Sequence, residues 1–147
     1  MKRVALAALV SMAACGGGAE GPDPAAEAAA AAARADSIAA AAVASAPAFR
    51  DSAQARLATL LDDPATATFD SVIVVQPPEV EGRLPARAVC GRMGGRPGVG
   101  GSRTPVRFIY ISAFTVFVEE DANRAKFADL WAKSCGAVGG VVQIGER

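Results

Sequence analysis

Apolar residues recur at helical spacing in one segment of the chain, between an alanine-rich stretch and a series of strand-like runs. Their positions follow the spacing i, i+4, i+8, i+11 and i+12: Phe49, Ala53, Leu57, Leu60 and Leu61. This spacing predicts the buried face of an amphipathic helix. We expect the helix to begin near Pro47 with Ser45 as its N-cap, because both residue types suit a first turn. It should end before Pro64, since the residue preceding a proline avoids the helical region.

Four runs of β-branched and aromatic residues predict strands in the second half of the chain. They cover residues 69–76, 86–93, 107–112 and 114–119. Their near-continuous apolarity indicates a sheet that is covered on at least part of both faces. A second helix is expected over residues 122–135, with Asp121 as its cap and Gly136 just past its end. Residues 138–144 fit either an edge strand or a frayed end.

The order of helix, strands and helix predicts the fold class α+β. We expect a small antiparallel sheet of three or four strands, with an N-terminal and a C-terminal helix packed on it and one disulfide. One face of the second helix carries Phe127, Leu130, Trp131 and Cys135. Trp131 lies one turn before Cys135, so its ring is expected to belong to the core and to cover a disulfide at that cysteine.

The first residues have the three zones of a bacterial signal peptide. Lys2 and Arg3 are followed by an apolar stretch and then by small residues up to Cys15. The apolar stretch is about eleven residues long, against about 20 for a transmembrane helix, which favours a signal over a lasting span. Residues 12–15, Met-Ala-Ala-Cys, resemble the bacterial lipobox, with methionine where the family usually has leucine. The resemblance implies lipidation of Cys15 and cleavage before it; an ordinary secretory signal with a chance cysteine is the alternative.

Three segments follow from these patterns: a signal peptide over residues 1–14, a Gly/Ala-rich tether or stalk over 15–46, and a small α+β domain over 47–147. Alanine dominates residues 25–46. Because alanine has the highest helix propensity, this part can be helical without a tertiary partner, and we interpret it as a semi-rigid stalk. A disordered linker and a coiled-coil seam are the alternatives, the second disfavoured because no heptad of Leu or Ile is present.

Lipid on Cys15 would place the protein in the cell envelope, because two or three acyl chains hold a protein stably on a membrane. Gly16 stands where an aspartate would signal inner-membrane retention, so the outer membrane is favoured if the host has two membranes.

Charge and composition exclude several kinds of function. The formal net charge is 0, and about −2 without the signal peptide, which argues against nucleic acid as a partner. The chain has no histidine, which excludes Ser–His and Cys–His catalysis and His-based zinc sites. We expect no metal and no cofactor.

Cys90 and Cys135 are the two cysteines that remain after lipidation. In an exported chain they predict one disulfide, with two separate buried thiols as the alternative. The bridge would close a loop of about 45 residues and contribute about 4 kcal/mol by the chain-entropy argument.

Two segments resemble signatures of an uncharacterised family of small exported bacterial proteins. Residues 61–69 are similar to the pattern L-x-D-P-x-S/T-A-x-F, and residues 89–101 to the pattern V-C-G-x-V-N-x-K-N-x-x-G-G. The resemblance covers roughly residues 49–136 and implies that Cys90 pairs with Cys135, but it brings no assigned activity. The two asparagines of the family fall on Gly94 and Pro97 here. Independently of the family, Asp63 and Thr66 can form a local turn that directs Phe69 into the core.

An arginine-rich stretch is the one concentration of charge in the chain. Between Glu81 and Glu119 there is no acidic residue, but there are six arginines: Arg83, Arg87, Arg92, Arg96, Arg103 and Arg107. Glycines within residues 94–101 would let backbone N–H groups approach an anion, and arginine adds bidentate recognition. The predicted anion-binding residues are Arg92, Arg96 and Arg103. Their partner would be an anionic envelope polymer, a phosphorylated lipid headgroup or the acidic patch of an envelope protein; a loop with solvated arginines is the alternative.

Two acidic groups, residues 62–63 and 119–121, could supply paired carboxylates for hydrolysis or for a hard metal ion. Each group lies at the end of a predicted helix, where capping and the helix dipole already account for acidic residues. We therefore expect no catalytic residue. The sequence is interpreted as a non-enzymatic envelope lipoprotein with a binding or assembly role, and a small carboxylate-dependent hydrolase is the alternative.

Overall fold

The computed structural model describes residues 23–96, 104–136 and 142–145 of the 147-residue chain. The elements follow in the order α1 (Pro24–Ala58), β1 (Asp63–Gln76), β2 (Ala88–Arg96), β3 (Val106–Ser112), β4 (Thr115–Val118), α2 (Arg124–Ser134) and β5 (Val142–Gly145). The strands form one sheet with the order β4-β3-β2-β1-β5, and all four neighbouring pairs are antiparallel. The predicted α+β class is confirmed, with β5 as an additional edge strand that overlaps the segment 138–144.

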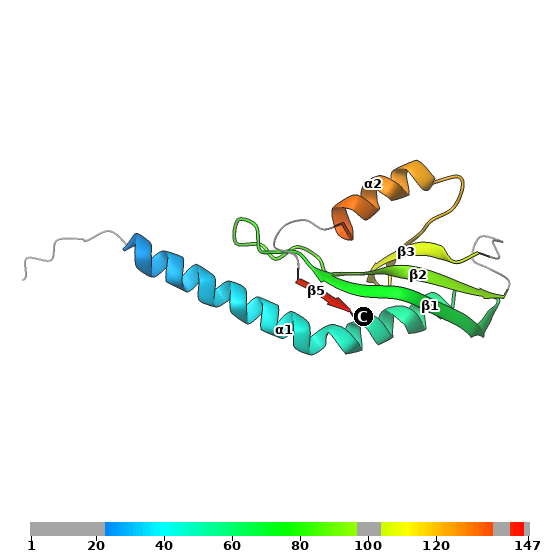
Figure 1. The fold of residues 1–147 in the computed structure, drawn as a ribbon, viewed down its shortest axis with the longest axis horizontal. Coiled ribbons are helices and arrows are strands. Elements are labelled where there is room, and N and C mark those ends of the chain that lie inside the picture. The colour runs from blue at the N-terminus through cyan, green and yellow to red at the C-terminus, as the bar shows by residue number, and fades with distance from the viewer. Residues whose placement is uncertain (1–22, 97–103, 137–141, 146–147) are drawn as a thin grey trace, which may run out of the picture.

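The sheet lies between the two helices, α1 on one face and α2 on the other (Figure 1). Side chains alternate between the two faces along each strand. On the α1 side, Val89 and Phe108 pack with Leu57 of the helix. On the α2 side, Cys90 and Ile109 pack with Phe127 of the second helix. Both faces are therefore covered in part, as the near-continuous apolar runs predicted.

Helix α1 is one continuous helix of 35 residues, about 52 Å long at a rise of 1.5 Å per residue. The predicted N-cap at Ser45 is wrong: its hydroxyl donates instead to the carbonyl of Ala41 at 2.7 Å, and the cap is Asp23, whose side chain accepts from the N–H of Ala25. Pro47 lies inside the helix. Figure 1 shows α1 changing direction in its cyan part, which contains Pro47, and proline accounts for the bend because it removes a helical hydrogen bond.

The helix continues through Pro47 because the surrounding residues favour it on both sides. Alanines with high helix propensity precede the proline. Beyond it, Ala53 and Leu57 are fully buried against the sheet. These contacts outweigh the one missing hydrogen bond, so the expected boundary at residues 46 and 47 is not a break in secondary structure. Among the described residues, neither helix is both long enough and apolar enough to span a membrane.

The connection between β1 and β2, residues 77–87, extends beyond the end of the sheet as the green loop of Figure 1 and is called the arm below. Its tip is a tight turn in which the backbones of Val80 and Arg83 exchange two hydrogen bonds of 2.9 Å. Glu81 and Gly82 between them have φ values of 50° and 74°. Two consecutive positive φ values define a type I′ turn, the turn that matches the twist of a hairpin.

Several boundaries differ from the expectation, and two of them involve residues predicted to form a turn or a cap. Strand β1 begins at Asp63 instead of residue 69, and the predicted local turn forms inside its first residues: Asp63 Oδ1 accepts from the N–H of Ala65, and the Thr66 hydroxyl donates to the Asp63 carbonyl. Helix α2 begins at Arg124, and Asp121 is not its cap. The side chain of Asn123, at the N-cap position, makes no capping hydrogen bond and accepts instead from the N–H of Glu120.

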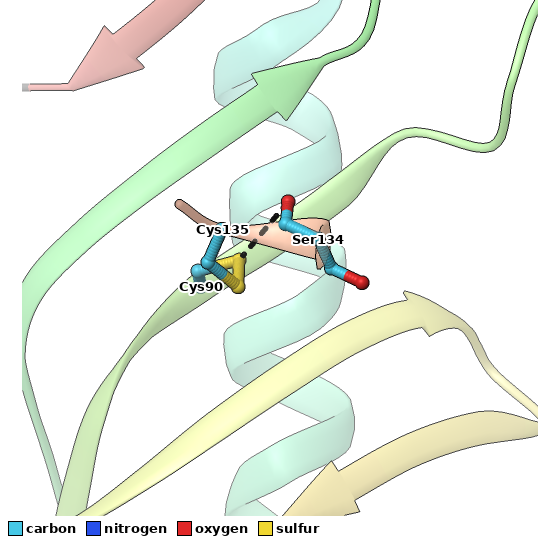
Figure 2. The surroundings of a disulfide bond; sticks show 3 residues. All are labelled: Cys90, Ser134 and Cys135. Atoms are coloured by element: carbon cyan, nitrogen blue, oxygen red, sulfur yellow. Dashed lines mark hydrogen bonds between the residues drawn. A yellow bond between two sulfur atoms is a disulfide. The ribbon is translucent and has the colours of Figure 1, made fainter. Parts of the chain in front are cut away.

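The predicted disulfide is confirmed. Cys90 of β2 and Cys135, the C-cap residue of α2, are joined with an S–S distance of 2.01 Å, and both residues are buried (Figure 2). The bond fastens the end of α2 to a central strand of the sheet. Trp131 is partly buried against the same cluster and lies 5.9 Å from Phe127 between ring centroids, as expected for a core residue.

Candidate functional site

The predicted site residues lie only in part within the described structure. Cys15 and Arg103 lie outside the described residues, and only the backbone of Arg96 is described, at the end of β2. Arg92 is exposed on β2. The prediction that these three arginines meet at one anion site therefore stays a prediction.

The other arginines of the arginine-rich stretch go to different places. Arg87 turns to the α1 side, where its Nη1 donates to the Ser45 hydroxyl at 2.7 Å and its guanidinium lies 4.2 Å from the centroid of the Phe49 ring. Arg83 is exposed in the turn of the arm. Arg83 and Arg87 both belong to the arm, whereas Arg92 belongs to β2, so these arginines lie in different surroundings although they are close in sequence.

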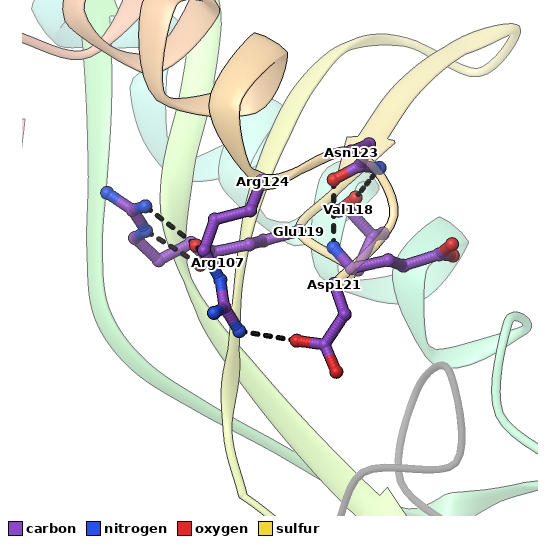
Figure 3. A network of polar contacts seen from close by, with 7 residues as sticks. Arg107, Val118, Glu119, Asp121, Asn123 and Arg124 are labelled. Carbon is purple, nitrogen blue, oxygen red and sulfur yellow. Dashed lines mark hydrogen bonds and ion pairs between the residues drawn. The ribbon is translucent and has the colours of Figure 1, made fainter.

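Arg107 forms a bidentate contact with Glu119 (Figure 3). Its Nε and Nη2 donate to the two carboxylate oxygens of Glu119, both at 2.8 Å. The same guanidinium lies 5.1 Å from the Trp131 ring and 5.4 Å from the Phe127 ring, measured to the centroids. The hydrogen bonds to Arg107 lower the pKa of Glu119, and the same bonds raise the pKa of Arg107. Both partners are thus held in their charged forms and fasten β3 to the segment that leads into α2.

Asn123 completes this network between β4 and α2 (Figure 3). Its Nδ2 donates to the carbonyl of Val118, the last residue of β4, at 2.9 Å. Arg124 is paired with Asp121 and lies 3.9 Å from Glu119. Glu119 and Asp121, which belong to the acidic group considered in the sequence as possibly catalytic, are thus engaged in ion pairs near the start of α2.

The two acidic groups of the sequence are not brought together. Asp63 belongs to β1, and Glu119 follows β4, with β2 and β3 between them. Three strand spacings of about 4.8 Å place β1 and β4 about 14 Å apart, beyond the separation of about 5–9.5 Å found in carboxylate pairs of glycosidases. Among the described residues there is also no group of three or more acidic or cysteine side chains that could hold a metal ion.

Arg92 has a charged residue opposite it on each side. In the sheet register it faces Asp70 of β1 and Arg107 of β3. The three side chains share the α2 face of the sheet. Arg92 and Arg107 lie two residues from Cys90 and Ile109, which pack on that face, and Asp70 pairs with Arg92 beyond a register shift in β1. Like charges opposite each other are unfavourable, and Glu119 offsets that repulsion by neutralising Arg107.

A groove of about 420 Å³ lies between the N-terminal half of α1 and the arm. Its walls are mostly apolar: Ala31, Ala35, Ile38, Ala39, Pro77 and Pro78. Its polar lining comes from Arg34, Asp36, Gln76 and Glu79. The composition of residues 15–46 predicts a tether or stalk and does not indicate this groove. The signal that could have revealed it is Ile38, the first bulky residue in the alanine-rich helix.

The two walls of the groove are joined by an ion pair. Arg34 Nε of α1 donates to Glu79 Oε2 of the arm at 2.6 Å, across 45 residues of sequence. The side chain of Glu79 is mostly buried, whereas that of Arg34 is exposed. The contact holds the arm against the helix at the edge of the groove.

Comparisons with models of protein families, with curated proteins and with solved structures find no match to this chain. The resemblance to a family of small exported proteins therefore stays a prediction from the two sequence signatures.

Proposed function

We propose that the protein is a lipid-anchored protein of the cell envelope, in which Cys15 carries the lipid and the α+β domain is a non-enzymatic binding module. The observation that carries this proposal is the exposed first part of α1. Residues 23–37 are all exposed, although they belong to a continuous helix whose later part is buried against the sheet. An exposed helical extension at the membrane-proximal end of a domain is what a spacer requires.

The length of this extension gives the spacer a definite size. The helical residues 24–30, which precede the first residue that lines the groove, span about 10 Å at 1.5 Å per residue. Their alanines maintain the helix without burial. With an anchor at Cys15 and a short tether before Asp23, the domain would stand clear of lipid headgroups. At that distance from the membrane, the domain could bind soluble or surface-bound components of the envelope.

A binding role is favoured over hydrolysis by the arrangement of polar groups. The two acidic groups that could form a catalytic pair lie at the start of β1 and after the end of β4, and two strands separate β1 from β4. The groove beside the arm, in contrast, combines apolar walls with a few polar groups, the usual composition of ligand sites. Its size also lies within the usual range of about 300–1,000 Å³ for small-molecule pockets.

Substitution of Cys15 tests the anchor. Cys15→Ala should release the protein from membranes or leave the signal peptide uncleaved, as measured by fractionation and by intact mass. The matched control is Met12→Leu, which brings the segment closer to the lipobox and should keep both lipidation and membrane association. A Cys15→Ala protein with the same mass and the same membrane fraction as wild type would show that Cys15 carries no lipid.

A further inference from the structure

The groove between α1 and the arm has walls built from small and rigid residues. On the helix, Ala31, Ala35 and Ala39 lie at successive i, i+4 positions and present only methyl groups. On the arm, Pro77 and Pro78 oppose them. Short side chains on one wall leave the space open, and proline rings on the other cannot turn aside to fill it.

The arm is pre-organised in this position. Pro77, Pro78 and Pro85 restrict its backbone, and the type I′ turn at Glu81 and Gly82 closes its tip. Gln76 holds the two sides of the arm together, because its Nε2 donates to the carbonyls of Pro77 at 3.2 Å and of Pro85 at 3.3 Å. A site whose walls are already ordered loses little conformational entropy when a ligand binds.

Gln76 also leaves one hydrogen-bonding atom unused. The residue is only 7% exposed and lines the groove. Both hydrogens of its amide are used, and Oε1 accepts no hydrogen bond from any described residue. Every fully buried side-chain nitrogen or oxygen of the described residues has a partner, so Oε1 must keep contact with solvent. We infer that this acceptor opens to the groove that the residue lines.

The charges at the groove favour a cationic ligand. Arg34 and Glu79 neutralise each other through their contact of 2.6 Å. Among the described lining residues, Asp36 is the one remaining charged residue, and it is exposed. The groove thus offers a ligand apolar walls, one negative charge and an unused acceptor, and no uncompensated positive charge.

We propose that this groove binds a small amphiphile with an extended apolar body and a primary ammonium head. The apolar body lies between the alanines of α1 and the two prolines of the arm. The ammonium group, which has three donors and no acceptor, is placed to meet the carboxylate of Asp36 or Oε1 of Gln76. The inference names a ligand class for the proposed binding module and rests on that binding role, but not on the lipid anchor, since every lining residue lies between positions 31 and 82.

Three probes that differ only in the head group test this proposal. Octylamine, octanol and octanoate are titrated, below the concentrations at which they form micelles, into the full chain carrying Cys15→Ala, which has no acyl group to compete. Backbone amide NMR shifts report the site and the dissociation constant. We expect octylamine to bind more tightly than octanol and octanoate most weakly, with shifts centred on residues 31–39 and 76–82. Equal affinities for the three probes, shifts centred elsewhere, or no binding at millimolar octylamine would overturn the proposal.

Two pairs of variants separate the walls from the charge. Ala35→Leu fills the groove and should weaken octylamine binding at least tenfold, whereas Ala33→Leu, on an exposed position outside the lining, should not change it. Asp36→Asn should lower octylamine affinity about twofold to fivefold, the range of an exposed charge pair, and leave octanol unaffected. Asp51→Asn makes the same chemical change on α1 away from the groove and should have no effect.

These outcomes are distinguishable from a failure of the proposed anchor, which is read from the fractionation of Cys15→Ala cells. Retained binding in Ala35→Leu would show that octylamine binds elsewhere, and equal losses in Ala33→Leu and Ala35→Leu would show a general effect on the helix. Either result overturns the groove as the site.

Discussion

The guanidinium of Arg107 donates two hydrogen bonds of 2.8 Å to the carboxylate of Glu119, and it lies 5.4 Å and 5.1 Å from the ring centroids of Phe127 and Trp131. One side chain therefore links β3, the end of β4 and helix α2. The pair lies at the boundary of the core, with both side chains mostly buried. Such bidentate, charge-assisted contacts are stronger than ordinary surface ion pairs.

This pair predicts a loss of stability in acid. Its hydrogen bonds to Arg107 hold the pKa of Glu119 below its ordinary value of 4.5. The stabilisation is therefore fully present above that value and is lost as the pH falls through the folded-state pKa. Urea unfolding between pH 7 and pH 3 should show this loss in wild type and a smaller one in Glu119→Gln. We expect Glu119→Gln to lower the free energy of unfolding by about 1–2 kcal/mol at pH 7.

Arg124→Gln is the control for this prediction. Because Nε of Arg124 lies 3.9 Å from Oε1 of Glu119, its loss should change the free energy of unfolding little. Identical pH profiles for wild type and Glu119→Gln would contradict the role of the pair.

The disulfide predicts a redox-dependent stability. Cys90 and Cys135 join β2 to the end of α2, so the double variant Cys90→Ala/Cys135→Ala should lower the free energy of unfolding by about 4 kcal/mol. The loss should appear as a lower urea midpoint, and a reducing agent should have the same effect on wild type but none on the variant. Mass spectrometry that finds both thiols free after alkylation without reduction would disprove the bridge in the mature protein.

Gly91 is predicted to be required by packing. A Cβ on this residue would lie 3.1 Å from Phe108 Cζ and 3.1 Å from both Cα and Cγ2 of Val72, so neither the ring nor the backbone of the next strand could stay in place. Gly91→Ala should therefore destabilise the domain by about 1–3 kcal/mol, measured by urea unfolding. Gly94→Ala, in the same strand and on the other face, is the control: its Cβ would meet the rotatable hydroxyl of Thr68 at 3.1 Å. Equal effects of the two substitutions would show that crowding at Gly91 is not the cause.

The anion-binding hypothesis for Arg92, Arg96 and Arg103 leads to a salt-dependent prediction. The triple substitution of these arginines by glutamine should leave the unfolding midpoint unchanged, since exposed charges contribute little to stability. The full chain carrying Cys15→Ala should bind cell-wall fragments or anionic vesicles at low salt, and binding should weaken as salt screens the charges. The triple variant should lose this binding. If wild type and variant bind equally, or if neither binds at low salt, the three arginines do not form an anion-binding site.

Local sequence patterns determined most of the secondary structure and the composition of the core. The helical spacing of Ala53 and Leu57 placed both residues on the buried face, as observed, because a helix that packs on a sheet must repeat its apolar residues every three or four positions. The strands were found for a similar reason, since β-branched and aromatic residues suit a half-buried pleated surface. The disulfide was predicted because Cys90 and Cys135 are the two cysteines that remain after lipidation of Cys15, and paired cysteines in exported proteins usually form disulfides.

The tertiary structure decided what those patterns leave open. Pro47 was interpreted as the start of a helix, but the burial of Ala46 and Ala53 on both sides of it carries one helix through. Arg87 and Arg107 belong to one basic stretch in sequence and lie on opposite faces of the sheet, because strand alternation and pairing separate them. The groove arises only when Arg34 meets Glu79, a contact that needs the length of α1 and the arm of the hairpin to coincide. Contacts between residues far apart in sequence are set by how complete elements pack, and no local pattern contains that information.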